Sequence, residues 1–141
     1  MIRSVLENKF LPALGCAALA LALVFAGCSS STTPPLSAFQ PEIANNPDNF
    51  QFQATGVTNV STTVIYFWSN SGTKAKVNQS SAITGGAADV VLLDADNVEV
   101  YRRSLAMDGD STSAAGAAGN WTVVVTLSSL DGTLNFRAQK Q

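Results

Sequence analysis

Few side chains in this sequence could carry out a chemical reaction. The 141 residues include no histidine, which removes the commonest general base together with the commonest metal ligand. Neither a Gly-rich phosphate-binding loop nor a Ser-x-x-Lys pattern is present. Asp94 and Asp96 could act as an acid and a base, but carboxylates two residues apart in a turn more often form the turn itself. The sequence therefore predicts a protein that is not an enzyme.

Carboxylates near predicted turns form another group of candidate ligands. Their oxygen atoms are the hard ligands that calcium prefers. The group consists of Asp89, Asp94, Asp96, Asp108 and Asp110. Because aspartate also favours turns without any metal, and no twelve-residue EF-hand loop is present, we predict no metal or other non-covalent cofactor. A weak calcium site is the alternative.

The sequence has two thiols, those of Cys16 and Cys28, and the surroundings of Cys28 are distinctive. Arg3 and Lys9 lead into an apolar run rich in Ala and Leu, which ends in Val24-Phe25-Ala26-Gly27 directly before Cys28. The polar stretch Ser29-Ser30-Ser31-Thr32-Thr33 follows at once. This arrangement resembles the signal of a bacterial lipoprotein, although Phe25 stands where that family usually has leucine.

The resemblance implies a covalent lipid anchor. Residues 1–27 would be a signal peptide that is cut after Gly27, and Cys28 would become a first residue that carries a diacylglyceryl group and an N-acyl chain such as palmitate. A single acyl chain holds a protein only marginally, so three would keep it on the membrane of the cell envelope. Ser29 stands where an aspartate would retain an enteric lipoprotein in the inner membrane, which favours the outer membrane.

Two other interpretations of the leader remain open. The apolar run approaches the roughly 20 residues that cross a bilayer, so residues 10–27 could be a retained transmembrane helix. They could also belong to an ordinary cleaved signal. Pro12 early in the run, and the absence of Lys or Arg directly after it, argue against a retained helix.

The charge of the chain excludes one class of partner. The leader carries two of the eight basic and one of the ten acidic residues, so its removal leaves six basic and nine acidic residues and a formal charge of −3. An acidic chain without a basic cluster is a poor match for nucleic acid. We therefore expect the partners to be the membrane, through the lipid, and an unknown envelope protein or glycan.

We predict that the segment 28–49 consists of the lipidated cysteine followed by a flexible linker. Their Ser, Thr, Pro and Asn residues bury too little apolar surface to offset the entropy of ordering. Leu36, Phe39 and Ile43 are exceptions that could dock onto the folded part.

Residues 50–141 alternate between short β-type segments and turn residues. The predicted strands are 50–54, 61–69, 74–83, 88–93, 98–105, 121–127 and 133–139. Seven or eight such strands without an amphipathic helix predict an all-β domain, namely a single antiparallel β-sandwich of jelly-roll or immunoglobulin-like topology. The predicted core consists of Phe52, Ile65, Phe67, Leu92, Val100, Trp121, Val123, Val125, Leu134 and Phe136.

The strand 61–69 is apolar on both of its faces. A period of two places Val64, Tyr66 and Trp68 on one face, and Ile65 and Phe67 on the other. A two-layer sandwich buries only one face, so the second face is either covered by the docked linker or open to a partner. Tyr66 and Trp68 are the candidate binding residues, since their rings combine an apolar body with a polar tip.

A second resemblance involves the segments 88–101 and 119–125. An apolar strand leads into the turn Asp94-Ala95-Asp96-Asn97 and a further strand, and Gly119-Asn120-Trp121-Thr122-Val123 follows later. The pattern is similar to bacterial pre-peptidase C-terminal domains and related jelly-roll modules, with Val91 in place of a second aspartate and Asn97 in place of a glycine. The resemblance implies an accessory binding or folding role without catalytic groups.

Two functions fit these observations. In the first, the protein is a membrane-anchored envelope lipoprotein whose small domain is a non-catalytic module that binds a glycan or an envelope protein. In the second, it is a structural lipoprotein that stabilises an envelope assembly without binding a small ligand.

Overall fold

The structure is a computed structural model and describes residues 35–141, so the predicted signal peptide and Cys28 lie outside the described residues. In the described part, a short 3-10 helix, η1 (Leu36–Phe39), precedes seven antiparallel strands, which confirms the predicted all-β fold. No helix among these residues is long and apolar enough to cross a membrane. The strands are β1 (Glu42–Asn46), β2 (Asn49–Asn70), β3 (Ala75–Gln79), β4 (Ala82–Leu93), β5 (Glu99–Ser104), β6 (Gly109–Thr112) and β7 (Gly119–Lys140).

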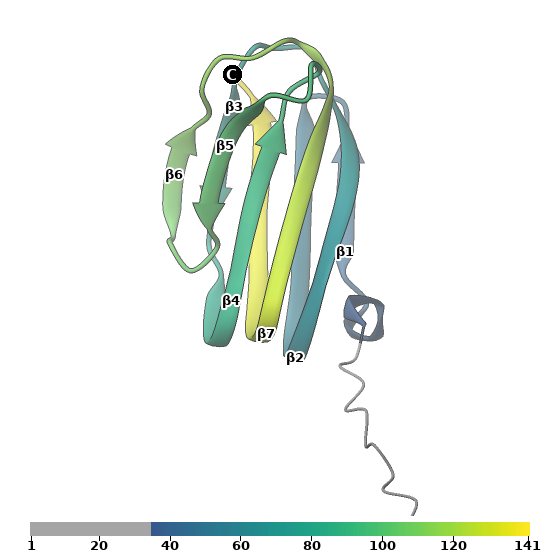
Figure 1. The fold of residues 1–141 in the computed structure, drawn as a ribbon, viewed down its shortest axis with the longest axis vertical. Helices are drawn as coiled ribbons and strands as arrows, with labels where there is room; N and C mark the ends of the chain where they lie inside the picture. The colour runs from purple at the N-terminus through teal and green to yellow at the C-terminus, as the bar shows by residue number, and fades with distance from the viewer. Residues whose placement is uncertain (1–34) are drawn as a thin grey trace, which may run out of the picture. The chain divides into compact units, whose positions relative to one another are not determined.

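One sheet, folded over on itself, forms both layers of the domain (Figure 1). β2 and β7 contain 22 residues each and pair with each other from Asn49 opposite Gln139 to Asn70 opposite Gly119. Both strands bend near their midpoints, and β4 follows β7 around the same bend. The two halves of each long strand therefore lie in different layers.

We name the two layers A and B. Layer A contains β1, residues 49–54 of β2, residues 134–140 of β7, β3 and β6. Layer B contains residues 62–70 of β2, residues 119–127 of β7, residues 87–93 of β4, and β5.

Glycines allow the strands to approach one another closely at the bend. Gly86 has a φ of +69°, and a Cβ atom there would lie 2.2 Å from the carbonyl oxygen of Ser129. Gly132 has a φ of +136°, and its Cβ atom would lie 2.2 Å from the carbonyl oxygen of Ala82. Only glycine tolerates both the positive φ and the missing space.

The bend corrects part of the predicted strand pattern. The predicted strands 74–83 and 88–93 are divided at Gly85-Gly86, and the predicted strands 121–127 and 133–139 at Asp131-Gly132, but the structure keeps β4 and β7 continuous through these residues. The register shifts there instead, as it does between Ala54 and Thr62 on β2. Bulges of this kind bend a strand without ending it.

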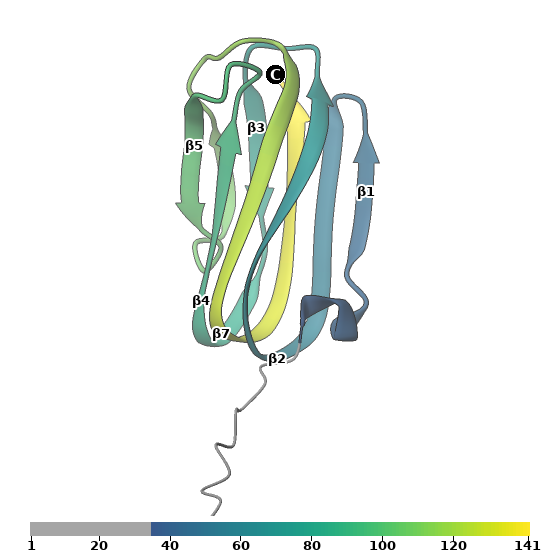
Figure 2. The ribbon, with the colours of Figure 1, turned by 45° about the vertical axis from the view of Figure 1, so that its right-hand side comes forward.

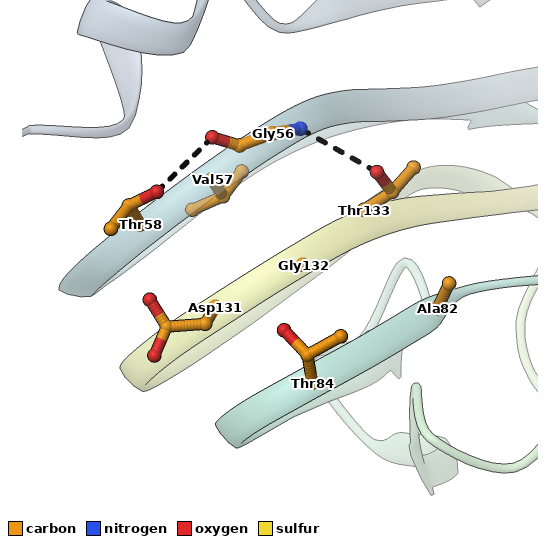
Figure 3. A pocket seen from close by; sticks show the side chains of 8 residues that line it. All are labelled: Gly56, Val57, Thr58, Ala82, Thr84, Asp131, Gly132 and Thr133. Atoms are coloured by element: carbon orange, nitrogen blue, oxygen red, sulfur yellow. Dashed lines mark hydrogen bonds between the residues drawn. The ribbon is translucent and has the colours of Figure 1, made fainter.

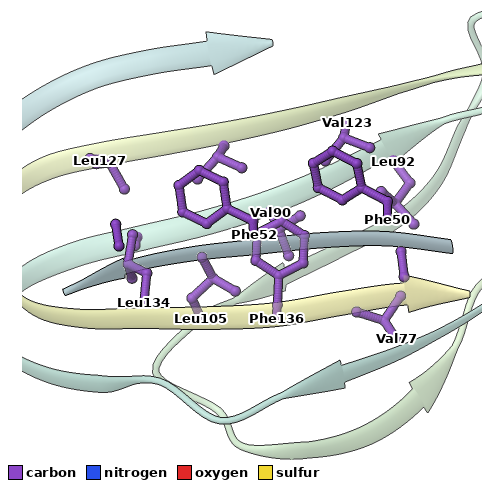
Figure 4. Close-up of a cluster of buried hydrophobic side chains, with 14 of the residues drawn as sticks. Phe50, Phe52, Val77, Val90, Leu92, Leu105, Val123, Leu127, Leu134 and Phe136 are labelled. Carbon is purple, nitrogen blue, oxygen red and sulfur yellow. The ribbon is translucent and has the colours of Figure 1, made fainter. Parts of the chain in front are cut away.

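Apolar side chains from both layers meet in one core (Figure 4). Phe52 and Phe136 stack, with ring centres 5.5 Å apart and planes inclined by 22°. The predicted core is confirmed at Phe52, Leu92, Val100, Trp121, Val123, Val125, Leu134 and Phe136. The predictions for Ile65 and Phe67 are wrong, because both side chains point from layer B into solvent.

The folded domain begins earlier than the sequence predicts. Part of the expected linker forms η1 and β1, and β1 pairs with β2 from Glu42 opposite Gln53 to Asn46 opposite Asn49. Leu36 is buried and Phe39 packs against the core, as their apolar character predicts, whereas Ile43 is 38% exposed. Within the segment 28–49, only residues 28–34 precede the described chain.

The two ends of the folded sheet differ. η1 lies at the end where β2, β4 and β7 bend, whereas the C-terminus lies at the opposite end (Figures 1 and 2). The loops 94–98 and 113–118 are also at that opposite end, which we call the loop end. The first described residues therefore enter the domain at its bend end.

Replacing Gly86 by alanine should destabilise the domain strongly. The left-handed backbone costs a non-glycine residue roughly 1–2 kcal/mol, and forcing the strands apart should cost about a further 1–3 kcal/mol. Gly56→Ala is the matched control, since Gly56 has a φ of +63° but its Cβ atom would meet nothing within 4 Å. Urea unfolding measures both losses; equal losses would contradict the role of the close approach.

Candidate functional site

The aromatic segment of β2 turns its predicted binding residues toward the core. Trp68 is fully buried, its ring meets that of Trp121 edge to face at 5.8 Å, and its indole N–H donates to the carbonyl oxygen of Asn46 at 3.2 Å. Tyr66 is half-buried, with its ring 5.5 Å from that of Phe50, and burial raises its pKa. The prediction of an open binding surface at Trp68 is therefore wrong, and Tyr66 is only partly accessible.

The opposite face of the same segment is open. Ile65 is 57% exposed and Phe67 is 65% exposed. Ile65 lies opposite Val124 on β7, which lies opposite Val91 on β4. Together with Leu93, these side chains form one apolar area on the outer face of layer B. The outer apolar patch consists of Ile65, Phe67, Val91, Leu93 and Val124. Ile65 and Phe67 are its exposed members, Leu93 and Val124 are half-buried, and Val91 is buried. Thr122 lies between Phe67 and Leu93 on the same face.

Polar groups border the outer apolar patch. The hydroxyls of Thr63 and Thr126 hydrogen-bond each other at 3.3 Å. On β5, the guanidinium of Arg102 donates two hydrogen bonds to the carboxylate of Glu99, at 2.9 and 2.7 Å. These hydrogen bonds hold the pKa of Glu99 below its ordinary value. An apolar centre with a polar rim is the usual anatomy of a protein interface.

The sequence interpretation did not identify the β4 and β7 residues of this patch. Val90-Val91-Leu92-Leu93 and Val123-Val124-Val125 are apolar at both odd and even positions, as is the segment 64–68. Each of the three strands therefore presents apolar side chains on both faces. That feature was the available signal, but the patch depends on the three strands being neighbours, which the sequence does not reveal.

Asp94 organises the loop end of the domain. Its Oδ1 atom accepts the N–H groups of Asp96 and Val98, each at 2.9 Å, and its Oδ2 atom accepts the N–H of Ala117 at 2.8 Å. These backbone hydrogen bonds, that of Ala117 foremost, lower the pKa of Asp94. A Cβ atom on Gly116 would lie 2.7 Å from Oδ2. Both carboxylate oxygens thus hold two loops together.

The other candidate calcium ligands are also engaged in structure or lie apart. Asp108 accepts the N–H of Ser81 at 3.0 Å, and Asp110 forms an ion pair with Lys76 at 2.9 Å. Asp89 lies on β4, opposite Thr126. Within residues 35–141, no three His, Cys, Asp or Glu side chains gather closely enough to hold a metal ion. The weak calcium alternative therefore gains no support from the geometry.

An open hollow of about 580 Å³ lies at the bend (Figure 3). Its carboxylate, that of Asp131, accepts the N–H of Asn59 at 2.8 Å. Its other polar contacts join backbone and hydroxyl groups, such as the N–H of Gly56 and the hydroxyl of Thr133 at 3.5 Å. Asp131 has no second ionisable group beside it among the residues that line the hollow, so the arrangement provides no acid–base pair.

The comparisons with known proteins identify no family. No protein-family model matches the chain, and no curated protein matches its sequence. The functional argument therefore depends on the residues and on the geometry of the domain.

The stability of the domain should fall in acid through Asp94. Because its folded-state pKa is lowered, Asp94 contributes stability that is fully present above the ordinary aspartate pKa of 3.8 and is lost as the pH falls through the lower folded value. Asp94→Asn should lower the melting temperature at neutral pH, since an amide nitrogen cannot accept the Ala117 N–H. The difference in melting temperature between Asp94→Asn and the parent protein should become smaller in acid, because the parent's Asp94 is then protonated as well.

Asp96→Asn is the control for this measurement. Asp96 is exposed, and in the described part of the chain its carboxylate forms no hydrogen bond. Its melting curves should follow those of the parent protein across the pH range. A deficit of Asp94→Asn that stayed constant from neutral pH into acid would contradict the assigned role of the carboxylate.

Proposed function

We propose that the protein is a lipid-anchored, non-catalytic binding protein of the bacterial envelope, held by Cys28 in the outer membrane. Its β-sandwich recognises another envelope protein through the outer apolar patch. The observation that carries this proposal is the exposure of Ile65 and Phe67, 57% and 65%, on a face where neighbouring strands add further apolar side chains. Contiguous apolar side chains that remain open to water are typical of interaction surfaces.

The chemistry of the patch favours a protein over a glycan. Four of its five residues are aliphatic, and Phe67 is its one aromatic ring. The hydroxyl-bearing side chain within the patch, that of Thr122 opposite Phe67 and Leu93, is buried with 9% exposed. The hydroxyls of Thr63 and Thr126 at the border bond each other. A sugar requires several directed hydrogen bonds beside an aromatic ring, whereas an apolar protein segment requires only area and shape.

The small number of residues between Cys28 and the described domain supports recognition close to the membrane. Seven peptide bonds separate Cys28 from Pro35, and a fully extended chain of that length spans at most about 25 Å. Because η1 lies at the bend end, a lipidated Cys28 would keep that end near the membrane. The patch would then lie on the side of the domain, where proteins of the same membrane can reach it.

Replacing Cys28 by serine should release the protein from the membrane. Without the thiol no diacylglyceryl group can be attached, so the protein should move from the membrane fraction to the soluble fraction. Mass spectrometry of the native protein should find a new N-terminus at Cys28 with added lipid mass. Cys16→Ser is the control and should leave the distribution unchanged. An intact leader or a bare thiol at Cys28 would remove the anchor from the proposal.

Replacing Phe67 by serine should weaken partner binding without unfolding the domain. The side chain is exposed, so its loss should change the melting temperature little. Chemical crosslinking in intact cells, followed by affinity purification, should recover at least about tenfold less partner, since losing a central interface side chain commonly costs over 1 kcal/mol. A stoichiometric partner protein would also fit the structural role of the alternative function.

Val98→Ser is the matched control for Phe67→Ser. Val98 is 56% exposed and lies in the loop after Asp94, outside the outer apolar patch. Recovery of the partner should be unchanged in this variant. Equal recovery with all three proteins would show that the patch is not the binding surface.

A further inference from the structure

Layer B has a free edge along β2, directly beside the outer apolar patch. In the described chain, residues 62–70 of β2 pair with β7 on one side only. The carbonyl oxygen of Phe67 points away from β7, because it accepts the side-chain N–H of Asn45 at 2.8 Å. The carbonyl oxygen of Ser69 points the same way and accepts the N–H of Asp48 at 2.8 Å.

The alternation of the backbone then identifies the open groups. The N–H and C=O of one strand residue point to the same side, and neighbouring residues point to opposite sides. Thr63 and Ile65 lie at every second position from Phe67, so their backbone groups point in the same direction as those of Phe67. The N–H and C=O of Thr63 and of Ile65 therefore face the edge, and so does the N–H of Phe67. The carbonyl oxygen of Phe67 is already occupied by the side-chain N–H of Asn45. An open row of backbone groups therefore runs from Thr63 to Phe67.

The other edges of the folded sheet are protected, and this one is not. Charges, prolines and short length discourage another strand from pairing with an edge. The protecting residues are Pro41, Glu42 and Pro47 around β1, Asp110 on the four-residue β6, and Glu99, Arg102 and Arg103 on β5. Residues 61–69 contain neither a charged residue nor a proline.

We infer that the β2 edge of layer B binds an extended segment of the partner protein as an additional strand. This inference rests on the proposed function and narrows its ligand to an uncharged, β-type polypeptide segment. Thr63, Ile65 and Phe67 would supply the hydrogen bonds, as in other cases of strand addition. Alternate side chains of the segment would lie beside Ile65 and Phe67 and extend the outer apolar patch, so apolar residues are expected at every second position.

A second copy of this chain is a poorer occupant of the edge. Two identical edges pair antiparallel about a twofold axis, which points the bend ends of the two copies in opposite directions. Residues 62–70 alone span about 30 Å at the usual rise per strand residue, whereas the tether from Cys28 reaches at most about 25 Å. Two copies anchored in one membrane therefore could not readily pair in this way.

Amide hydrogen exchange on the full chain tests the inference. The probe is a synthetic peptide with the sequence of residues 119–127, the natural neighbour of this β2 segment, extended by two lysines at each end for solubility. We expect the peptide to protect the amides of Thr63, Ile65 and Phe67, which face the edge. The amides of Val64 and Tyr66, which already face β7, should keep their exchange rates.

Two substitutions at Ile65 separate strand addition from contact with the apolar face. Ile65→Pro removes the edge N–H, and proline is tolerated where that group faces solvent. Ile65→Thr removes the same apolar side chain but keeps the N–H. Peptide affinity should be at least about tenfold lower for Ile65→Pro than for Ile65→Thr, because one hydrogen bond to a buried partner is commonly worth over 1 kcal/mol. If Ile65→Pro does not fold, the alternating protection in the parent protein decides the test.

Three results would overturn the inference. The first is no protection by the peptide at millimolar concentration. The second is equal affinity for the two Ile65 variants, which would mean that the partner contacts the face only; the proposed function would still stand if Phe67→Ser weakened partner recovery. The third is a dimer of the protein that forms without the peptide, is detected by sedimentation and protects the same amides from exchange. That result would mean that a second copy of the chain occupies the edge.

Discussion

The whole domain depends on the close approach of backbone to backbone at the bend. β4 runs beside β7 there, with Gly86 against the carbonyl oxygens of Ser128 and Ser129, and Gly132 against that of Ala82. Because three adjacent strands turn at the same level, the sheet folds over without losing its pairing order. The inner faces of layers A and B then meet, and Phe50 and Phe52 from one half of β2 reach Tyr66 from the other half.

Folding one sheet in this way determines which surfaces remain open. The same strands supply both layers, so the inner positions of each half are buried, and the outer face of layer B has no element of the described chain over it at Ile65 and Phe67. The fold also leaves β2 at an edge of layer B, although it is covered by β1 in layer A. The outer apolar patch and the free edge are thus two consequences of one topology.

The sequence predicted the local features of the fold better than its long-range ones. Strict alternation along 134–138 identified the inward side chains, because a strand with polar residues on one face has only one way to pack. The prediction that strands end at Gly85-Gly86 and Asp131-Gly132 was wrong. Glycine and aspartate occur both in turns that end a strand and in bulges that bend one, so their presence does not distinguish the two. Pro41 and Pro47 suggested a linker, but Pro47-Asp48 is the turn of the β1–β2 hairpin, with Asp48 at a φ of +61°.

The candidate site was hidden by an ambiguity of the same kind. Both faces of the segment 64–68 are apolar, so a period of two cannot determine which face is inside. The structure buries Trp68, whose indole N–H has a partner in Asn46, beside Trp121. Ile65 and Phe67 consequently stay in water, where each lacks much of the roughly 1.5–3 kcal/mol that full burial would contribute. A sequence can retain such exposed side chains for a partner that covers them, and on the proposed function an added strand at the β2 edge would provide that burial.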